Sequence, residues 1–107
     1  MTTSVATVLR EFLGDPNERR YGFDLMQSCG LASGSLYPIL ARLETAGWIE
    51  GQREELDPAQ EGRPARKYYQ LTTKGRAEAT RELAALSARF QLPDWTLNPR
   101  LAWGGTA

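Results

Sequence analysis

The short link between two predicted helices constrains this fold more than any other feature of the sequence. One helix is predicted over about residues 22–29, and Gly30 fits the left-handed residue that ends a helix. Only Leu31 and Ala32 separate that glycine from the next start at Ser33. Ser33 or Ser35 caps the helix that follows, which runs to about Ala46. Two helices joined by so tight a turn are typical of a helix-turn-helix.

Apolar spacing predicts the inward sides of these two helices. The inward side of the first would hold Phe23, Met26 and either Leu25 or Cys29. The second stops at Gly47 and has a buried stripe made of Leu36, Ile39, Leu40 and Leu43.

Pro38 lies within this second helix, and its effect depends on which serine is the cap. If Ser35 caps, Pro38 is the third helical residue, whose N–H would have no partner within the helix anyway. If Ser33 caps, one hydrogen bond to the carbonyl of Gly34 is lost.

An amphipathic helix precedes the pair. It is predicted over residues 4–13, capped by Ser4 or Thr3 and ended at Gly14. A short basic segment, residues 19–21, then leads into the helix predicted over about residues 22–29. The stripe has apolar offsets of 0, 3, 4, 7 and 8 and consists of Val5, Val8, Leu9, Phe12 and Leu13.

A hairpin and a last helix are predicted downstream. Residues 48–55 read as a strand, 56–64 as a polar loop and 66–71 as the return strand. Thr72 or Thr73 then caps a helix over about 74–90. This order predicts a winged helix-turn-helix, a mainly α fold with a small β-hairpin. We divide the chain into a winged domain, 1–72, and a C-terminal dimerisation helix with an apolar tail, 73–107.

The composition argues against an enzyme. The 107 residues include no His and a single Cys, Cys29. Histidine is the commonest general base, and a lone cysteine makes neither a disulfide nor a structural metal site. We therefore expect a binding module without a metal or cofactor. No apolar run approaches the roughly 20 residues of a membrane span, so we expect no membrane partner and a cytoplasmic location.

Positive charge is concentrated in one place. The whole chain balances 13 basic against 13 acidic residues, yet residues 63–76 contain no acid. Such a stretch predicts a surface for an anion, and a phosphate backbone is the anion favoured. An ordinary solvated strand face is the alternative. The basic residues are Arg63, Arg66, Lys67, Lys74 and Arg76, and the acids just upstream are Glu50, Glu54, Glu55, Asp57 and Glu61.

Several motifs resemble those of the PadR family of bacterial transcriptional regulators. They are YGFDL at 21–25, SGSLYPIL at 33–40, RLE at 42–44, GWI at 47–49 and GRPARKYYQLT at 62–72 with Lys74-Gly75. The family more often has His-Gly where this chain has Tyr21-Gly22, and the region after the hairpin is short. The resemblance implies a homodimeric repressor that binds inverted-repeat promoter DNA and dimerises through its C-terminal helix.

DNA-contacting residues are predicted on the third helix and on the hairpin, which is the wing of this fold. Arg63 is expected at the wing tip, and Arg66 and Lys67 point to opposite faces of a regular strand. Of Tyr68 and Tyr69, one would lie in the core and the other would contact a phosphate. The outward residues of the third helix are Ser33, Ser35, Tyr37, Pro38 and Arg42.

The last helix and the tail predict a dimer. Trp95 and Trp103 either cover a dimer core, which we favour, or line a site for a small aromatic effector. A winged helix that binds another protein, as an adaptor without DNA, is the alternative function. The seam predicted on the helix consists of Ala79, Leu83, Leu86 and Phe90.

Overall fold

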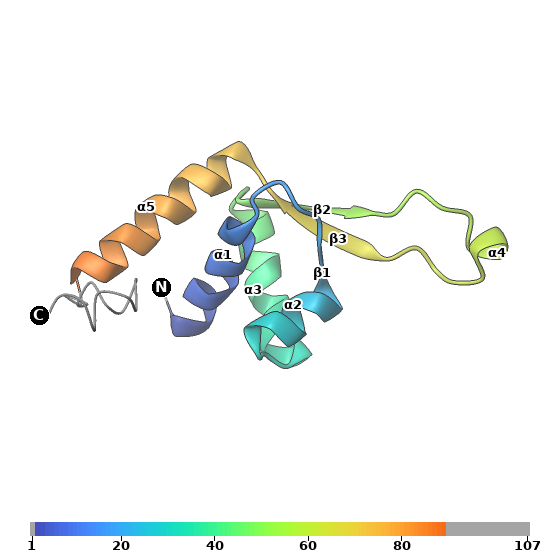
Figure 1. Ribbon diagram of the computed structural model, residues 1–107, viewed down its shortest axis with the longest axis horizontal. Helices are drawn as coiled ribbons and strands as arrows, with labels where there is room; N and C mark the ends of the chain where they lie inside the picture. The colour runs from blue at the N-terminus through green and yellow to red at the C-terminus, as the bar shows by residue number, and fades with distance from the viewer. Residues whose placement is uncertain (1, 90–107) are drawn as a thin grey trace, which may run out of the picture.

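The computed structural model describes residues 2–89. Its elements are α1 (Thr3–Gly14), β1 (Arg20–Tyr21), α2 (Gly22–Cys29), α3 (Ser33–Thr45), β2 (Ile49–Arg53), α4 (Pro58–Glu61), β3 (Lys67–Leu71) and α5 (Thr73–Arg89). Figure 1 shows α1, α2 and α3 gathered below a small sheet, with the wing extending to one side and α5 to the other. The predicted winged helix-turn-helix is confirmed.

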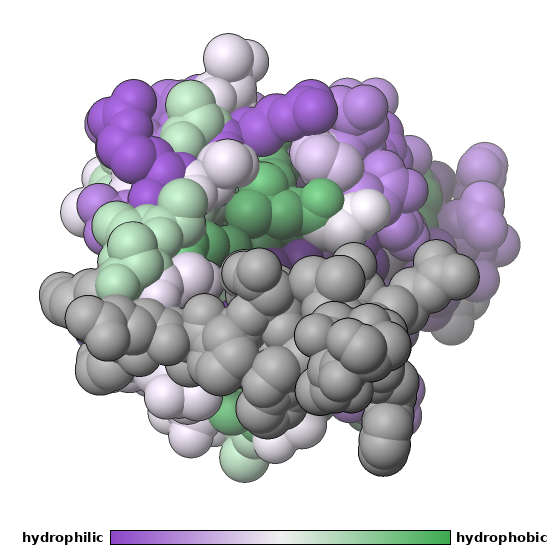
Figure 2. All heavy atoms as spheres, turned by 60° about the vertical axis from the view of Figure 1, so that its left-hand side comes forward, coloured by the Kyte–Doolittle hydropathy of each residue, from purple (hydrophilic) through white to green (hydrophobic). Residues whose placement is uncertain are grey.

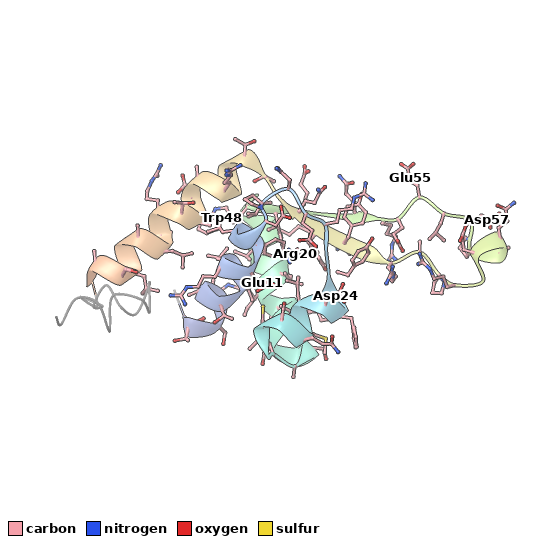
Figure 3. All side chains as sticks on the ribbon, viewed as in Figure 1. Glu11, Arg20, Asp24, Trp48, Glu55 and Asp57 are labelled. Carbon is pink, nitrogen blue, oxygen red and sulfur yellow. The ribbon has the colours of Figure 1, made fainter. Side chains whose placement is uncertain are left out.

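The wing belongs to a three-stranded antiparallel sheet with the order β1-β3-β2. Tyr21 of β1 pairs with Tyr68 of β3, and Arg20 pairs with Tyr69. We expected no strand at residues 19–21, because two residues are too short to show an alternating pattern. The strand forms only because β3 offers an edge and because Arg20 secures it. The Nη2 of Arg20 donates to the carbonyl of Glu11 in α1 at 2.8 Å (Figure 3).

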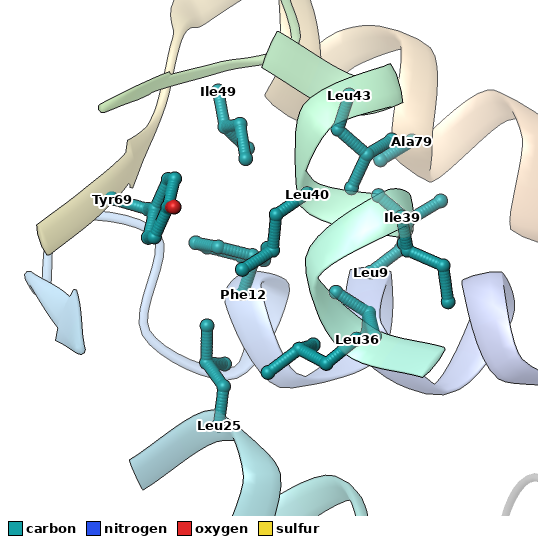
Figure 4. Close-up of a cluster of buried hydrophobic side chains, with 11 residues drawn as sticks. Leu9, Phe12, Leu25, Leu36, Ile39, Leu40, Leu43, Ile49, Tyr69 and Ala79 are labelled. Carbon is teal, nitrogen blue, oxygen red and sulfur yellow. The ribbon is translucent and has the colours of Figure 1, made fainter. Parts of the chain in front are cut away.

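The core lies where α1, α2 and α3 meet the sheet (Figure 4). The predicted stripes of α1 and α3 are confirmed, since their central residues are buried and their outer ones pack at the rim. Burying side chains of this size stabilises the fold by about 1.5–3 kcal/mol each. The core cluster consists of Val8, Leu9, Phe12, Leu25, Leu36, Ile39, Leu40, Leu43, Ile49, Tyr69 and Ala79.

The inward side of α2 differs from the prediction. Phe23 is 65% exposed, whereas Leu25 is fully buried. The inward stripe instead begins at Gly22, which is buried and touches Tyr37 of α3. Residues three, four and seven positions further along the helix follow it inward. A glycine carries no hydropathy signal, so the sequence pattern placed Phe23 on this stripe wrongly.

The helix caps also correct the sequence predictions. The cap of α1 is Thr2, whose Oγ1 accepts a hydrogen bond from the backbone N–H of Val5 at 3.2 Å. The cap of α3 is Ala32, which has no capping side chain, so neither Ser33 nor Ser35 is the cap. Pro38 therefore lies in the sixth position of α3 and supplies no N–H for the carbonyl of Gly34.

The wing tip contains a helix that we did not predict. Residues 56–64 were expected to form a polar loop, but α4 occupies the middle of this segment. The Asp57 side chain accepts from the backbone N–H of Ala59 at 3.0 Å, and Pro58 is the first helical residue. Gly62, with φ 69°, ends the helix. This Asp-Pro start and Gly stop are strong local signals for one helical turn.

Thr72 joins the wing to α5 and confirms one of the two predicted caps. Its hydroxyl donates to the carbonyl of Gly47 at 2.6 Å and accepts from the backbone N–H of Gly75 at 2.9 Å. These bonds dock the first turn of α5 against the chain entering β2. Ala79, one turn further along, is fully buried in the core. Within residues 2–89, no helix is both long and apolar enough to cross a membrane.

Candidate nucleic-acid interface

The exposed face of α3 carries the residues predicted to contact DNA. Ser33, Ser35, Tyr37, Pro38 and Arg42 are all exposed. The predicted outward side of the helix is thus confirmed as a surface, and contact with DNA stays a prediction.

These residues divide between the two edges of that face. One helical turn takes about 3.6 residues, so Ser35 and Arg42 share one edge while Tyr37 lies near the other. Arg42 lines a hollow of about 410 Å³ together with Val5 of α1. Tyr37 lines a different hollow of about 260 Å³, beside Lys67 of the wing. The fold therefore brings Tyr37, and not Arg42, next to the wing.

Phe23 is a surface residue that the sequence analysis did not place here. It lines the same small hollow as Tyr37 and Lys67. A Cβ added at Gly22 would overlap the ring and hydroxyl of Tyr37. Tyr37 therefore packs across the start of α2 while remaining 45% exposed. The hollow combines two exposed aromatic rings with two basic residues, Arg66 and Lys67, a combination that suits the sugar-phosphate backbone of a nucleic acid.

The sequence predicted Arg63 at the wing tip, but Arg63 lies elsewhere in the structure. The tip is formed by α4 (Figure 1), and Arg63 lies on the arm that returns from it. Its Nη1 donates to Oε1 of Glu54 at 2.7 Å and its Nη2 to Oε2 at 3.3 Å. The two arms of the wing are joined by this forked ion pair.

Arg66 and Lys67 point to opposite faces of the sheet, as predicted. The guanidinium of Arg66 lies 4.5 Å from the ring centre of Tyr21, on the outer face. The Nζ of Lys67 lies 5.3 Å from the ring centre of Tyr69 and 3.5 Å from a carboxylate oxygen of Glu44 in α3. The Lys67 ammonium therefore lies on the side of α3, and Arg66 also lines the hollow beside Tyr37.

Both wing tyrosines are buried, so the expectation that one of them contacts a phosphate is wrong. Tyr68 and Tyr69 are each 5% exposed. The Tyr68 hydroxyl donates to Oε1 of Gln52 at 2.8 Å, and the guanidinium of Arg19 lies 4.4 Å from its ring centre. Tyr21 covers the ring from β1, with the two ring centres 6.1 Å apart. The unpredicted strand β1 is the reason Tyr68 is covered.

Glu54 is the acidic centre of the wing. The hydrogen bond from the Arg63 side chain, and next the one from the backbone N–H of Arg66, lower the pKa of Glu54 from 4.5 to about 2. Because its pKa is lowered in the folded chain, the ionised carboxylate stabilises the wing above about pH 4.5. That contribution is lost as the pH falls from there toward 2.

We expect Arg63→Ala to raise the pKa of Glu54 toward its ordinary value, because the largest cause of the shift is removed. Carbon NMR of the side-chain carboxyl during an acid titration measures the midpoint. Arg53→Ala, which removes an exposed arginine from β2, is the control and should leave the midpoint in place. A midpoint that does not move in Arg63→Ala contradicts the forked pair.

Only part of the predicted dimerisation seam on α5 is accessible to a partner subunit. Ala79 is fully buried among the core residues of its own chain, so it cannot meet a partner and its place in the seam is corrected. Leu83 is partly buried against the same core. Leu86 is half-buried. Phe90, Trp95 and Trp103 lie outside the described residues.

No group of three or more His, Cys, Asp or Glu side chains in the described part of the chain is placed to hold a metal ion. The chemistry available on this surface is therefore that of hydroxyl, aromatic and guanidinium groups on α3 and the wing.

Comparisons with known proteins identify the family and the fold. Residues 13–81 match the transcriptional regulator PadR-like family. The structure of smu.1704 from Streptococcus mutans is 27% identical, with a TM-score of 0.65 and 94% of each chain covered. A PadR-like transcription factor from Bacteroides fragilis is 24% identical, with a TM-score of 0.63, covering 81% of this chain and 82% of its own.

A third structure is of overoxidized AbfR bound to DNA; AbfR is a protein of Staphylococcus epidermidis. It is 24% identical, with a TM-score of 0.66, covering 99% of this chain and 71% of its own, and it shows the same fold. No curated protein matches. The family match spans most of the chain, including α3 and the wing. The family is one of regulators rather than enzymes. The chain therefore belongs to the PadR-like family of transcriptional regulators.

Proposed function

We propose that the chain is a sequence-specific repressor that binds an inverted-repeat operator in cytoplasmic DNA as a homodimer. One observation carries this proposal: α3 turns its hydroxyl-bearing and arginine side chains outward, on a fold whose wing holds four basic residues. These are Arg53, Arg63, Arg66 and Lys67. A helix exposed in this way enters the major groove, while the wing follows the backbone. AbfR, which shares the fold, has been seen bound to DNA.

The two edges of the exposed face of α3 would make different contacts in the complex with DNA. Ser33 and Ser35 would donate to base edges or phosphates, and Pro38, which lies near the middle of the face, would contact a thymine methyl. Arg42 would reach a guanine or a phosphate. Tyr37, beside Lys67 and Phe23, would meet the backbone where the helix and the wing adjoin.

The dimer is supported by apolar surface between α1 and α3. The hollow of about 410 Å³ is lined mainly by apolar side chains, among them Val5, Ile39, Leu43 and Trp48. Figure 2 shows apolar side chains gathered on the face that comes forward when the left-hand side of Figure 1 is turned toward the viewer, with hydrophilic side chains above and to the right of them. Leu86, which the predicted seam includes, lies half-buried on α5. A single winged helix reads only a short half-site, so two copies related by a two-fold axis are needed for useful specificity.

Binding to a random-sequence duplex at several salt concentrations tests the proposal against the adaptor alternative. We expect the logarithm of the affinity to fall linearly with the logarithm of the NaCl concentration, by about 0.9 for each phosphate contacted. Fluorescence anisotropy of a labelled duplex measures this slope. Selection from a randomised duplex library should then enrich two half-sites in inverted orientation, about one helical turn apart.

An adaptor that binds only protein would show no measurable affinity for duplex at any salt concentration. Enrichment of a single half-site, or of none, would contradict the inverted repeat while leaving DNA binding intact. A small aromatic effector, the other role considered for Trp95 and Trp103, remains a prediction. Adding such a compound to the same anisotropy assay would test it.

A further inference from the structure

A carboxylate of the wing itself, that of Glu54, neutralises two of the wing's arginines. Glu54 accepts from both Nη atoms of Arg63, at 2.7 and 3.3 Å. It also accepts from the backbone N–H of Arg66 at 2.9 Å and from the Nε of Arg66 at 3.3 Å. The Glu54 side chain is 14% exposed, whereas those of Arg63 and Arg66 are 40% and 57% exposed. One covered carboxylate therefore holds two arginines that face the solvent.

The donors that Glu54 uses are those that a DNA phosphate would need. A forked guanidinium binds a carboxylate or a phosphate with the same two N–H groups. A backbone phosphate can therefore take the Nη groups of Arg63 only by displacing the carboxylate of Glu54. The low pKa of Glu54 keeps the carboxylate ionised throughout the neutral range, so this competitor is always present.

The outer face of the sheet strengthens this arrangement. The Tyr21 ring lies beneath the guanidinium of Arg66, and its hydroxyl donates to Oε2 of Glu54 at 3.4 Å. Tyr21 is itself fixed by pairing with Tyr68. The two arms of the wing and β1 thus converge on one carboxylate, which restrains both arginines in positions folded against the sheet.

Glu55 provides an internal contrast. It follows Glu54 directly and carries the same charge. Figure 3 shows its side chain pointing away from the wing, and it is exposed. Within residues 2–89 it makes no ion pair. The effect of Glu54 is therefore separable from that of a negative charge on the wing as such.

We propose that Glu54 is a specificity-determining residue, a substitute phosphate that holds Arg63 and Arg66 away from random DNA. The proposal rests on the DNA-binding function proposed above. A random duplex offers α3 few matched base contacts, so it does not supply the free energy needed to separate both arginines from Glu54. The specific site supplies these contacts and brings the wing close enough for its phosphates to take over the two arginines. The result is a wider gap between specific and random affinity.

The test compares Glu54→Gln with Glu55→Gln, which changes the net charge equally. Affinity for a random-sequence duplex is measured by anisotropy between about 50 and 200 mM NaCl. We expect Glu54→Gln to bind about fivefold more tightly than Glu55→Gln and to steepen the salt slope by about one to two units, one for each arginine released. In an Arg63→Ala/Arg66→Ala background, Glu54→Gln should have no advantage over Glu55→Gln.

The outcomes separate this proposal from the proposed function. If the parent protein does not bind duplex at any salt concentration, DNA binding itself is wrong. If the parent binds but Glu54→Gln behaves like Glu55→Gln, or binds more weakly, Glu54 does not compete with phosphate and only this inference is overturned. An advantage that persists without the two arginines overturns it as well, because the effect would not run through them.

An NMR measurement on the parent protein tests whether Glu54 keeps Arg66 from random DNA, even if Glu54→Gln fails to fold. Nitrogen NMR follows the Nε–H of Arg66 while random duplex is added to saturation. We expect this resonance to stay at the position of the free protein, because Arg66 remains on Glu54. A shift as large as that of the backbone amides of α3 would show that random DNA already captures the wing, and would overturn the proposal.

Discussion

Replacing Gly75 with alanine is expected to destabilise the chain by about 3 kcal/mol, although alanine is the better helix former. A Cβ at this position would overlap the carbonyl of Trp48. That carbonyl cannot easily yield, because it accepts from the backbone N–H of Thr72 at 3.0 Å. The first turn of α5 would have to move outward and would draw Ala79 out of the core. Thermal unfolding followed by circular dichroism should show a melting temperature lower by about 15 °C.

Gly34→Ala is the matched control. Gly34 also lies in the first turn of a helix, but nothing lies within 4 Å of the Cβ it would gain. We expect this variant to melt at or slightly above the temperature of the parent protein. Its free energy of unfolding should rise by less than about 1 kcal/mol. Equal melting temperatures for the two variants would mean that α5 does not approach Trp48 as closely as the structure shows.

Leu86→Asp is expected to convert the proposed dimer into monomers that no longer bind operator DNA. Leu86 is half-buried on α5, one turn beyond Leu83, which packs against the core. A carboxylate in an apolar interface has no partner there, and truncating a buried leucine already costs about 2–5 kcal/mol. Light scattering at micromolar concentration measures the mass, and anisotropy measures the lost affinity.

Ala85→Asp is the control for this variant. It places the same charge on the same helix, one residue away, at an exposed position. We expect it to remain dimeric and to keep its affinity. A monomeric parent protein, or a Leu86→Asp variant that stays dimeric, would remove α5 from the proposed interface.

The elements that could be predicted from the sequence are those whose signals are local. The stripes of α1 and α3 repeat within a few residues, and Gly30, with φ 67°, ends α2 as its position after the helix predicts. The Thr72 cap depends on an N–H only three residues away. The outward face of α3 follows from its own stripe, which is why Ser35, Tyr37 and Pro38 were placed on the surface correctly.

The charged surface of the wing depended on contacts between distant segments. Arg63 and Arg66 were predicted to contact DNA, and the sequence did not reveal that Glu54 lies across the hairpin from them and holds both. Tyr68 is covered because β1, 47 residues earlier, pairs with it. A basic stretch read along the sequence does not reveal which acid the return arm will meet, because the register of the two arms decides that.

The sequence by itself therefore determined the order of the four longer helices and the two hairpin strands, the exposed side of α3 and the family, because periodicity and motifs are properties of neighbouring residues. It did not reveal β1 or α4. The tertiary structure alone decided that Phe23 faces outward, that Ala79 belongs to the monomer's own core and that the wing arginines converge on Glu54. Each of these depends on the docking of one element against another. The free energy of such docking comes from close packing and paired charges between segments far apart in the chain.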